Sequence, residues 1–204
     1  MSDIEAIMRM APVIPVLVID DAAHGVPIAQ ALVAGGLPVL EVTLRTPAAL
    51  DVIRAMKTVP GAVVGAGTVL NARDLDASLE AGAEFIVSPG LTAGLAQAAA
   101  KTGVPFLPGT ANASDIMLGL DLGLTRFKFF PAEASGGIAA LKAISGPFGE
   151  VRFCPTGGIT QATAGNWLAL DAVLCVGGSW LVPQGPPDPE TIEAAAHAAR
   201  ALVQ

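Results

Sequence analysis

Short runs of apolar and often β-branched residues recur along the chain, separated by segments rich in alanine and leucine. Several runs are apolar at almost every position (PVLEVTL, AVVGAG, EFIVS, RFKFF and AVLCV), which is typical of parallel strands covered on both faces. We place strand starts 21 to 25 residues apart, near Val13, Pro38, Ala62, Glu84, Pro105, Arg126, Val151 and Ala172. Each interval fits one strand, one short helix and two loops of ~2–6 residues.

The segments between the strands carry the signals of helix ends. Glycines that can adopt a left-handed conformation precede several strands, at Gly35–Gly36, Gly82, Gly103 and Gly123. Residues that can cap a helix N-terminus follow several strands, at Thr46, Asn71, Thr92, Asn112 and Thr160. Pro47 follows Thr46, and we expect it at the first helical position, where its missing N–H is tolerated.

Eight βα units in series predict an α/β fold, a closed (β/α)8 TIM barrel. A doubly wound open sheet is the alternative, but it usually has fewer strands. The 204 residues lie near the short end of the size range of this barrel, so its loops must be short. Residues 2–10 have helical spacing, and we expect an extra N-terminal helix that covers the bottom of the barrel. No linker divides the chain, so residues 1–204 are predicted to form one domain.

Composition and charge narrow the functional classes. The formal net charge of −7 argues against a nucleic-acid surface, which needs clustered lysine and arginine. No apolar segment reaches the ~18 residues of a membrane span. Asp3 and Glu5 lie where a secretory signal would carry positive charge. Cys154 and Cys175 lack metal-site spacing and are expected to be free thiols, which favours the cytoplasm.

Lys128 stands out among the residues at the carboxyl ends of the strands, where a barrel places its chemistry. It lies within RFKFF, beside Phe127, Phe129 and Phe130. Apolar surroundings disfavour a charged amine, and a neutral amine is a nucleophile towards carbonyls. From the residues alone, a strand lysine that extends to solvent at the barrel mouth is an equally good interpretation.

Glu41, Thr43 and Arg45 share the parity of one predicted strand and so are expected to face the same way. A carboxylate inside a barrel is costly unless it is paired or functional. Glu41 could transfer protons, and Arg45 could hold a substrate carboxylate through two hydrogen bonds. The structural alternative is an ion pair between Glu41 and Arg45 at the rim.

Glycine-rich turns follow the last two predicted strands, at Thr156-Gly157-Gly158 and Gly177-Gly178-Ser179. Barrels frequently bind phosphate with the backbone N–H groups of these two loops, so the sequence predicts a phosphate site here. His24 and His197 fall on predicted helices, away from the strand ends. Without a cluster of His, Asp or Cys at the mouth, we expect no catalytic metal. Trp167 and Trp180 are expected to be packing residues.

The strand-end segments together resemble the KDPG/KHG aldolases, which are lysine-dependent aldolases of 2-keto-3-deoxy-6-phosphogluconate and 4-hydroxy-2-oxoglutarate. The resemblance spans nearly the whole chain, and FKFFPAE and EVTLRT are its most specific parts. The matching segments, in chain order, are PVLEVTLRT (38–46), VGAGTV (64–69), FIVSPG (85–90), FLPGT (106–110), RFKFFPAE (126–133), CPTGGI (154–159) and VGGSW (176–180).

The resemblance implies a role for each matching residue. Lys128 is the expected Schiff-base lysine, and Glu41 is the general acid and base. The groups expected at the pyruvyl half of the substrate are Arg45, Thr68, Pro89, Phe130 and Thr156, and those at the phosphate end are Gly157, Gly158, Gly178 and Ser179. The family also implies a barrel without cofactors that assembles as a homotrimer.

The expected reaction is cleavage of 2-keto-3-deoxy-6-phosphogluconate to pyruvate and glyceraldehyde 3-phosphate, with activity towards 4-hydroxy-2-oxoglutarate. The galactonate epimer is an alternative substrate, and GGSW favours the gluconate branch. A phosphate-binding isomerase or epimerase could share the glycine loops, but it has no need of a buried lysine nucleophile. A catalytically inactive sugar-phosphate binder is disfavoured by the intact set of Glu41, Arg45 and Lys128.

Overall fold

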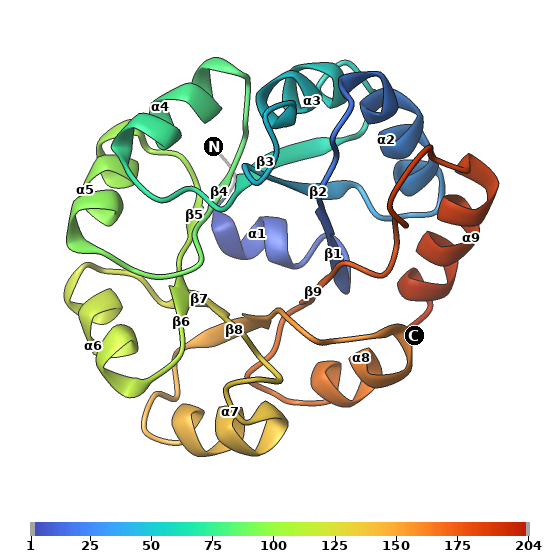
Figure 1. Cartoon of the computed structure of the whole chain (residues 1–204). Helices are drawn as coiled ribbons and strands as arrows, with labels where there is room; N and C mark the ends of the chain where they lie inside the picture. The colour runs from blue at the N-terminus through green and yellow to red at the C-terminus, as the bar shows by residue number, and fades with distance from the viewer. Residues whose placement is uncertain (1–2, 203–204) are drawn as a thin grey trace.

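The computed structural model describes residues 3–202 and has an α/β fold in which parallel strands are surrounded by helices (Figure 1). The strands are β1 (Val13–Leu17), β2 (Val39–Thr43), β3 (Val63–Gly67), β4 (Ile86–Val87), β5 (Phe106–Leu107), β6 (Gly109–Thr110), β7 (Arg126–Phe129), β8 (Arg152–Pro155) and β9 (Val176–Gly178). The helices are α1 (Ile4–Met8), α2 (Gly25–Ala34), α3 (Ala49–Met56), α4 (Ala72–Glu80), α5 (Ala93–Thr102), α6 (Ala113–Asp121), α7 (Gly137–Ser145), α8 (Gln161–Leu168) and α9 (Pro189–Arg200), with a 3-10 turn, η1, at Ala22–His24.

The strands form two parallel sheets. The larger has the order β5-β4-β3-β2-β1-β9, and the smaller has the order β6-β7-β8. Two isolated parallel bridges, Phe153 to Val173 and Thr156 to Gly177, join the segment around β8 to the segment around β9. The predicted α/β fold with a parallel sheet is therefore confirmed.

Two predicted strands differ in detail from the observed ones. The strand expected near Pro105 is two short strands, β5 and β6, separated by Pro108. Proline has no N–H to donate to a ladder, which explains the interruption. The strand expected near Ala172 begins at Val176, and only the bridge at Val173 marks its predicted start.

Most predicted helix ends are confirmed. The Asn71, Thr92 and Asn112 side chains accept hydrogen bonds from the first turns of their helices, and Thr160 forms a capping box. The glycines before the strands have positive φ at Gly36, Gly82, Gly103 and Gly123. The start at Thr46-Pro47 is wrong, because α3 begins at Ala49. The Thr46 hydroxyl instead donates to the Ile19 carbonyl at 2.7 Å.

Two hydrophobic clusters lie on opposite faces of the strands, an outer one between strands and helices and an inner one on the face away from the helices. The inner cluster consists of Ile7, Met8, Ile14, Val39, Phe85, Val87, Leu107, Cys154 and Cys175. Its first two members belong to α1, which lies near the centre of the view in Figure 1, among the strands. The Arg126 Nε group donates to Glu5 at 2.7 Å and so links α1 to β7. The first residue of the predicted helix 2–10 lies outside the described residues.

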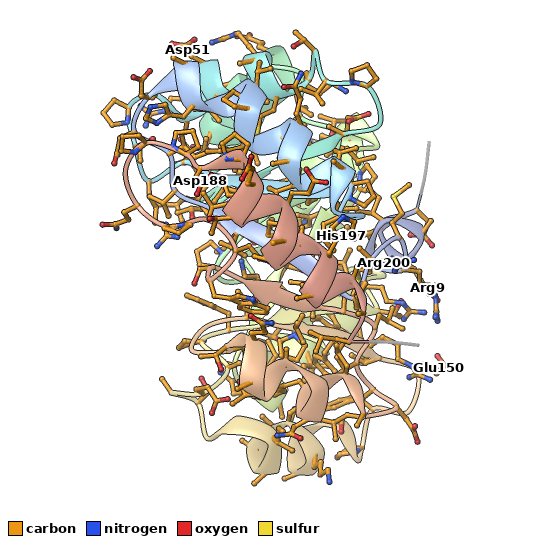
Figure 2. All side chains as sticks on the ribbon, turned by 90° about the vertical axis from the view of Figure 1, so that its right-hand side faces the viewer. Arg9, Asp51, Glu150, Asp188, His197 and Arg200 are labelled. Atoms are coloured by element: carbon orange, nitrogen blue, oxygen red, sulfur yellow. The ribbon has the colours of Figure 1, made fainter. Side chains whose placement is uncertain are left out.

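The outer surface carries most of the charged side chains. Figure 2 shows α9 running from Asp188 on one side of the molecule to Arg200 on the other, where Arg9 and Glu150 also lie. His197 lies on α9 as predicted and is largely exposed, with Glu193 as its neighbour. Within residues 3–202, no helix is both long and apolar enough to cross a membrane.

Candidate active site

Lys128 and Glu41 meet on the inner face of the strands, away from the surrounding helices. Lys128 is on β7 and Glu41 is on β2, and the lysine Nζ donates to the glutamate Oε1 at 2.9 Å. Both side chains are buried, with exposed fractions of 7% and 4%. Because desolvated charges are stable only when they are paired, each side chain explains how the other can be buried. Lys128 therefore does not extend to solvent, and Glu41 pairs with Lys128 and not with Arg45.

The aromatic surroundings expected for Lys128 are only partly present. Phe127 and Phe129 alternate with Lys128 along β7 and so face the helices, where their rings lie 6.4 Å from those of Phe153 and Trp167. Only the Phe130 ring is near the lysine, with Nζ 5.4 Å from the ring centroid. The Glu41 carboxylate and the Phe130 ring are therefore among the neighbours of the amine.

The glycines of β3 make room for the interior side chains. A Cβ on Gly67 would collide with the Glu41 carboxylate, and one on Gly65 would lie 2.5 Å from the Phe85 ring. Gly67 is not among the site residues predicted from the sequence. It lies two residues after Gly65 in VVGAG, so both glycines are on the inward face of the strand. Its function is to leave space for the Glu41 side chain.

Thr43 connects the site to Arg45. Its hydroxyl donates to the Leu17 carbonyl at 2.8 Å and accepts from the Arg45 Nε at 3.2 Å. Arg45 lies two residues beyond the end of β2 and is exposed. Glu41 and Thr43 thus face the same way, as predicted. Arg45 lies beyond the end of the strand, at the rim.

The loops after β3 and β4 carry two further predicted residues. Thr68 follows β3 and is the only non-glycine residue in the described part of the chain with positive φ, at 60°. Such a conformation is uncommon outside glycine and clusters at functional sites. The Pro89 carbonyl packs against Gly109, which is in register with Lys128. No hydrogen bond within residues 3–202 joins Thr68 or Pro89 to Lys128 or Glu41. Their positions beside the site follow from their neighbours, Gly67 against Glu41 and Gly109 in register with Lys128.

The glycine loop after β8 lies beside the segment that follows β7. Thr156 is buried and bridges to Gly177, and Gly157 lies against Phe130. Gly157 and Gly158 have φ of 104° and 79°, which only glycine adopts without strain. Consecutive backbone amides in such conformations form the concave sites that bind anions.

Gly178 and Ser179 end the last strand. Gly178 is buried, with the Trp180 ring packed directly on its α-carbon, whereas Ser179 is exposed. The bridge from Thr156 to Gly177 brings this turn beside the glycine loop after β8. The two predicted phosphate-binding turns are therefore neighbours.

Two thiols lie in the same interior. Cys154 is in register with Lys128, and both cysteines are buried and free. The hydrogen bond with Cys154 and the burial raise the pKa of Cys175 well above the ordinary thiol value, and the Glu41 charge adds to this effect. A neutral, enclosed thiol is a packing group and a weak nucleophile.

The donor set does not suit a metal. In residues 3–202, no three His, Cys, Asp or Glu side chains come together in a way that could hold an ion. The arrangement places a proton acceptor, the Glu41 carboxylate, beside the Lys128 amine. This is what addition of a lysine to a ketone requires, since the amine must lose a proton to attack. The fold and the site thus define a class, that of α/β proteins in which a lysine and a glutamate are paired at a buried site.

Comparison with known proteins identifies the family to which the chain belongs. The family model for KDPG and KHG aldolase matches residues 4–195. The chain is 63% identical over 202 residues to the 2-dehydro-3-deoxy-phosphogluconate aldolase of Zymomonas mobilis. The alignment covers 99% of this chain and 97% of that protein. The chain belongs to the KDPG and KHG aldolase family, and it is a carbon–carbon lyase.

Solved structures agree with this assignment. The structure of a Zymomonas mobilis 2-keto-3-deoxy-6-phosphogluconate aldolase with 3-phosphoglycerate superposes with a TM-score of 0.97 at 62% identity, over 99% of this chain and 97% of that chain. A KDPG aldolase from Legionella pneumophila, with pyruvate captured as a covalent carbinolamine, superposes with a TM-score of 0.92 at 44% identity, over 100% of this chain and 99% of that one.

The buried pair generates a prediction about stability. Lys128→Met and Glu41→Leu each leave one unpaired buried group, and we expect each to lower the free energy of unfolding by about 3 kcal/mol. The double variant removes both charges and is expected to be more stable than either single variant. Urea denaturation of the four proteins measures this. Additive losses in the double variant would contradict the pairing.

Proposed function

We propose that this protein cleaves 2-keto-3-deoxy-6-phosphogluconate to pyruvate and glyceraldehyde 3-phosphate through a Schiff base on Lys128. The observation that carries the proposal is the buried contact of 2.9 Å between Lys128 and Glu41. The names of the relatives support the substrate, and the carbinolamine in the Legionella pneumophila enzyme supports the chemistry. The KHG name of the family supports additional activity towards 4-hydroxy-2-oxoglutarate, which has the same pyruvyl half.

The first half of the reaction builds the imine. Glu41 accepts a proton from the Lys128 ammonium, and the neutral amine adds to the C2 ketone to give a carbinolamine. The hydroxyl at C2 then leaves as water after protonation, for which Glu41 returns a proton. The product is a protonated imine. Its positive nitrogen can accept the electron pair of the C3–C4 bond.

The second half breaks the carbon–carbon bond. Glu41, through a water molecule, removes the C4 hydroxyl proton, and the C3–C4 electrons flow to the imine as glyceraldehyde 3-phosphate leaves. Protonation of the resulting enamine at C3 and hydrolysis of the imine release pyruvate and free Lys128. The Phe130 ring, 5.4 Å from Nζ, forms an apolar wall beside the pyruvyl group.

The other predicted residues hold the substrate. Arg45, Thr68, Pro89 and Thr156 are proposed to surround the pyruvyl half. For Arg45, its place at the rim and its bond to Thr43 support this role, because an exposed guanidinium can meet an incoming carboxylate. Gly157, Gly158, Gly178 and Ser179 are proposed to bind the phosphate. Positive φ at the first two, their position before the N-terminus of α8 and the exposed hydroxyl of Ser179 support this.

The finer features of the fold also remain proposals. We infer that the strands form one closed barrel, in which β5 and β6 are a single strand interrupted at Pro108, and that residues 1–204 are one domain. The bridges between the segments around β8 and β9 support closure. The packing of Ile7 and Met8 against the inner cluster supports α1 as the cover of the bottom of the barrel.

The assembly and setting of the enzyme are proposals as well. A homotrimer, as the family resemblance implies, is supported by exposed apolar side chains on α6, at Met117, Leu118 and Leu120. We expect light scattering after size exclusion to give three times the 20.5 kDa mass of the chain. A monomer mass would contradict this.

Free thiols support a cytoplasmic location, and the net charge of −7 is unfavourable for binding nucleic acid.

Substitution of the pair tests the proposed roles. Lys128→Ala is expected to abolish pyruvate release from 2-keto-3-deoxy-6-phosphogluconate. Lys128→Arg is its matched control, because arginine keeps a positive charge but cannot form the imine. Glu41→Gln is expected to lower kcat by about 10²- to 10⁴-fold while imine formation remains possible. Pyruvate release is measured by coupling to lactate dehydrogenase, with the galactonate epimer as a second substrate. Turnover by Lys128→Ala near the wild-type rate would contradict the assignment.

A further inference from the structure

The proposed phosphate-binding loop is held from behind by the segment that follows the lysine strand. The Ala132 N–H donates to the Thr156 carbonyl at 2.8 Å, and the Glu133 N–H donates to the Gly157 carbonyl at 3.1 Å. In a trans peptide the C=O and the following N–H point in opposite directions. Since the Gly157 carbonyl faces Glu133, the Gly158 N–H points away from that segment. It has no acceptor among the residues that the structure describes.

The Glu133 side chain continues this support. A Cβ on Gly158 would lie 2.8 Å from both Cβ and Cγ of Glu133, so the aliphatic stem of the glutamate lies directly behind Gly158. The carboxylate Oε1 accepts a hydrogen bond from the Trp167 Nε1 at 3.1 Å. Trp167 is fully buried on α8, the helix that begins just after the glycine loop. Glu133 thus contacts Gly158 through its aliphatic stem and Trp167 on α8 through its carboxylate.

The direction of the carboxylate also has an electrostatic consequence. Glu133 is an exposed carboxylate next to a loop that is proposed to bind a phosphate, and like charges repel. The Trp167 N–H fixes the carboxylate against α8, so that its stem, and not its charge, lies against the loop. The Phe129 ring, 6.4 Å from the Trp167 ring, connects the indole to the strand that carries Lys128.

We propose that the Glu133–Trp167 pair is a positioning device for the phosphate half of the substrate, which orients the Gly157–Gly158 amides without touching the reacting atoms. The inference rests on the proposed cleavage of a phosphorylated keto acid. Its consequence is selective: the pair contributes to binding of the phosphorylated substrate and leaves imine formation with pyruvate unaffected. Pyruvate has no phosphate end, so it reports on the Lys128 site alone.

Three variants separate the elements of this device. Trp167→Phe keeps an aromatic ring in the core but removes the N–H donor. Glu133→Ala removes the stem and the acceptor, whereas Glu133→Gln keeps both and removes only the charge. Asp171→Ala changes another exposed carboxylate, beyond the end of α8, and serves as the matched control. Circular dichroism melting establishes which variants fold, and Trp167→Phe decides the question if Glu133→Ala does not.

The experiment measures KM and kcat for 2-keto-3-deoxy-6-phosphogluconate, and the pyruvate concentration that gives half-maximal borohydride inactivation. Trp167→Phe and Glu133→Ala are expected to raise KM about three- to tenfold, the effect of one hydrogen bond, with kcat within about twofold of the wild-type value. Half-saturation by pyruvate is expected to stay unchanged. Glu133→Gln and Asp171→Ala are expected to resemble the wild type in all three quantities.

Three results would overturn the inference. An unchanged KM in both Trp167→Phe and Glu133→Ala would show that the pair does not position the loop. A parallel loss of pyruvate binding would show a general structural role, and a Glu133→Gln protein as impaired as Glu133→Ala would show that charge, not the hydrogen bond, matters. A wild-type protein that traps pyruvate but does not cleave the phosphorylated substrate would instead refute the proposed function, and the positioning role with it.

Discussion

Lys128 and Glu41 form a buried ion pair that limits which residues can surround it. Two charges buried among the strands cost several kcal/mol each unless they are paired at close range. The pair forms because β2 and β7 face one another across the interior, and because Gly67 has no side chain where the Glu41 carboxylate lies. The inner cluster, closed by Ile7 and Met8, keeps the pair enclosed on one side. On the other side are the short loops that end the strands.

Those loops combine close packing with available backbone amides. The Pro89 carbonyl against Gly109, the Thr156 side chain against Gly177 and the Trp180 ring against Gly178 each require a glycine. Such contacts let the residues that follow the strands lie close to the lysine. In the same loops, the Gly158 N–H has no hydrogen-bond acceptor among the described residues. Small residues therefore allow the close packing of the interior, and we propose that the same residues bind the phosphate of the substrate.

Much of this architecture could be predicted from the sequence, because the period of apolar runs fixes the alternation of strands and helices. Parity correctly places Glu41 and Thr43 inside, and the resemblance indicates a nucleophilic lysine that the residues alone leave undecided. Parity also shows that Phe127 and Phe129 face away from Lys128, although adjacency in sequence suggested otherwise. The contact of Glu133 with Trp167 joins residues 34 positions apart, so no local pattern reveals it. Pro108 is visible in the sequence, yet one strand is predicted there, whereas the structure has two short strands on either side of this proline.

The proposed reaction requires an imine between Lys128 and pyruvate. Borohydride reduction of the wild-type protein in the presence of pyruvate, followed by peptide mass spectrometry, detects this imine. We expect one reduced pyruvyl adduct, confined to the peptide that contains Lys128 and absent from Lys128→Arg. A protein left unmodified, or an adduct on another lysine, would rule out the proposed role of Lys128.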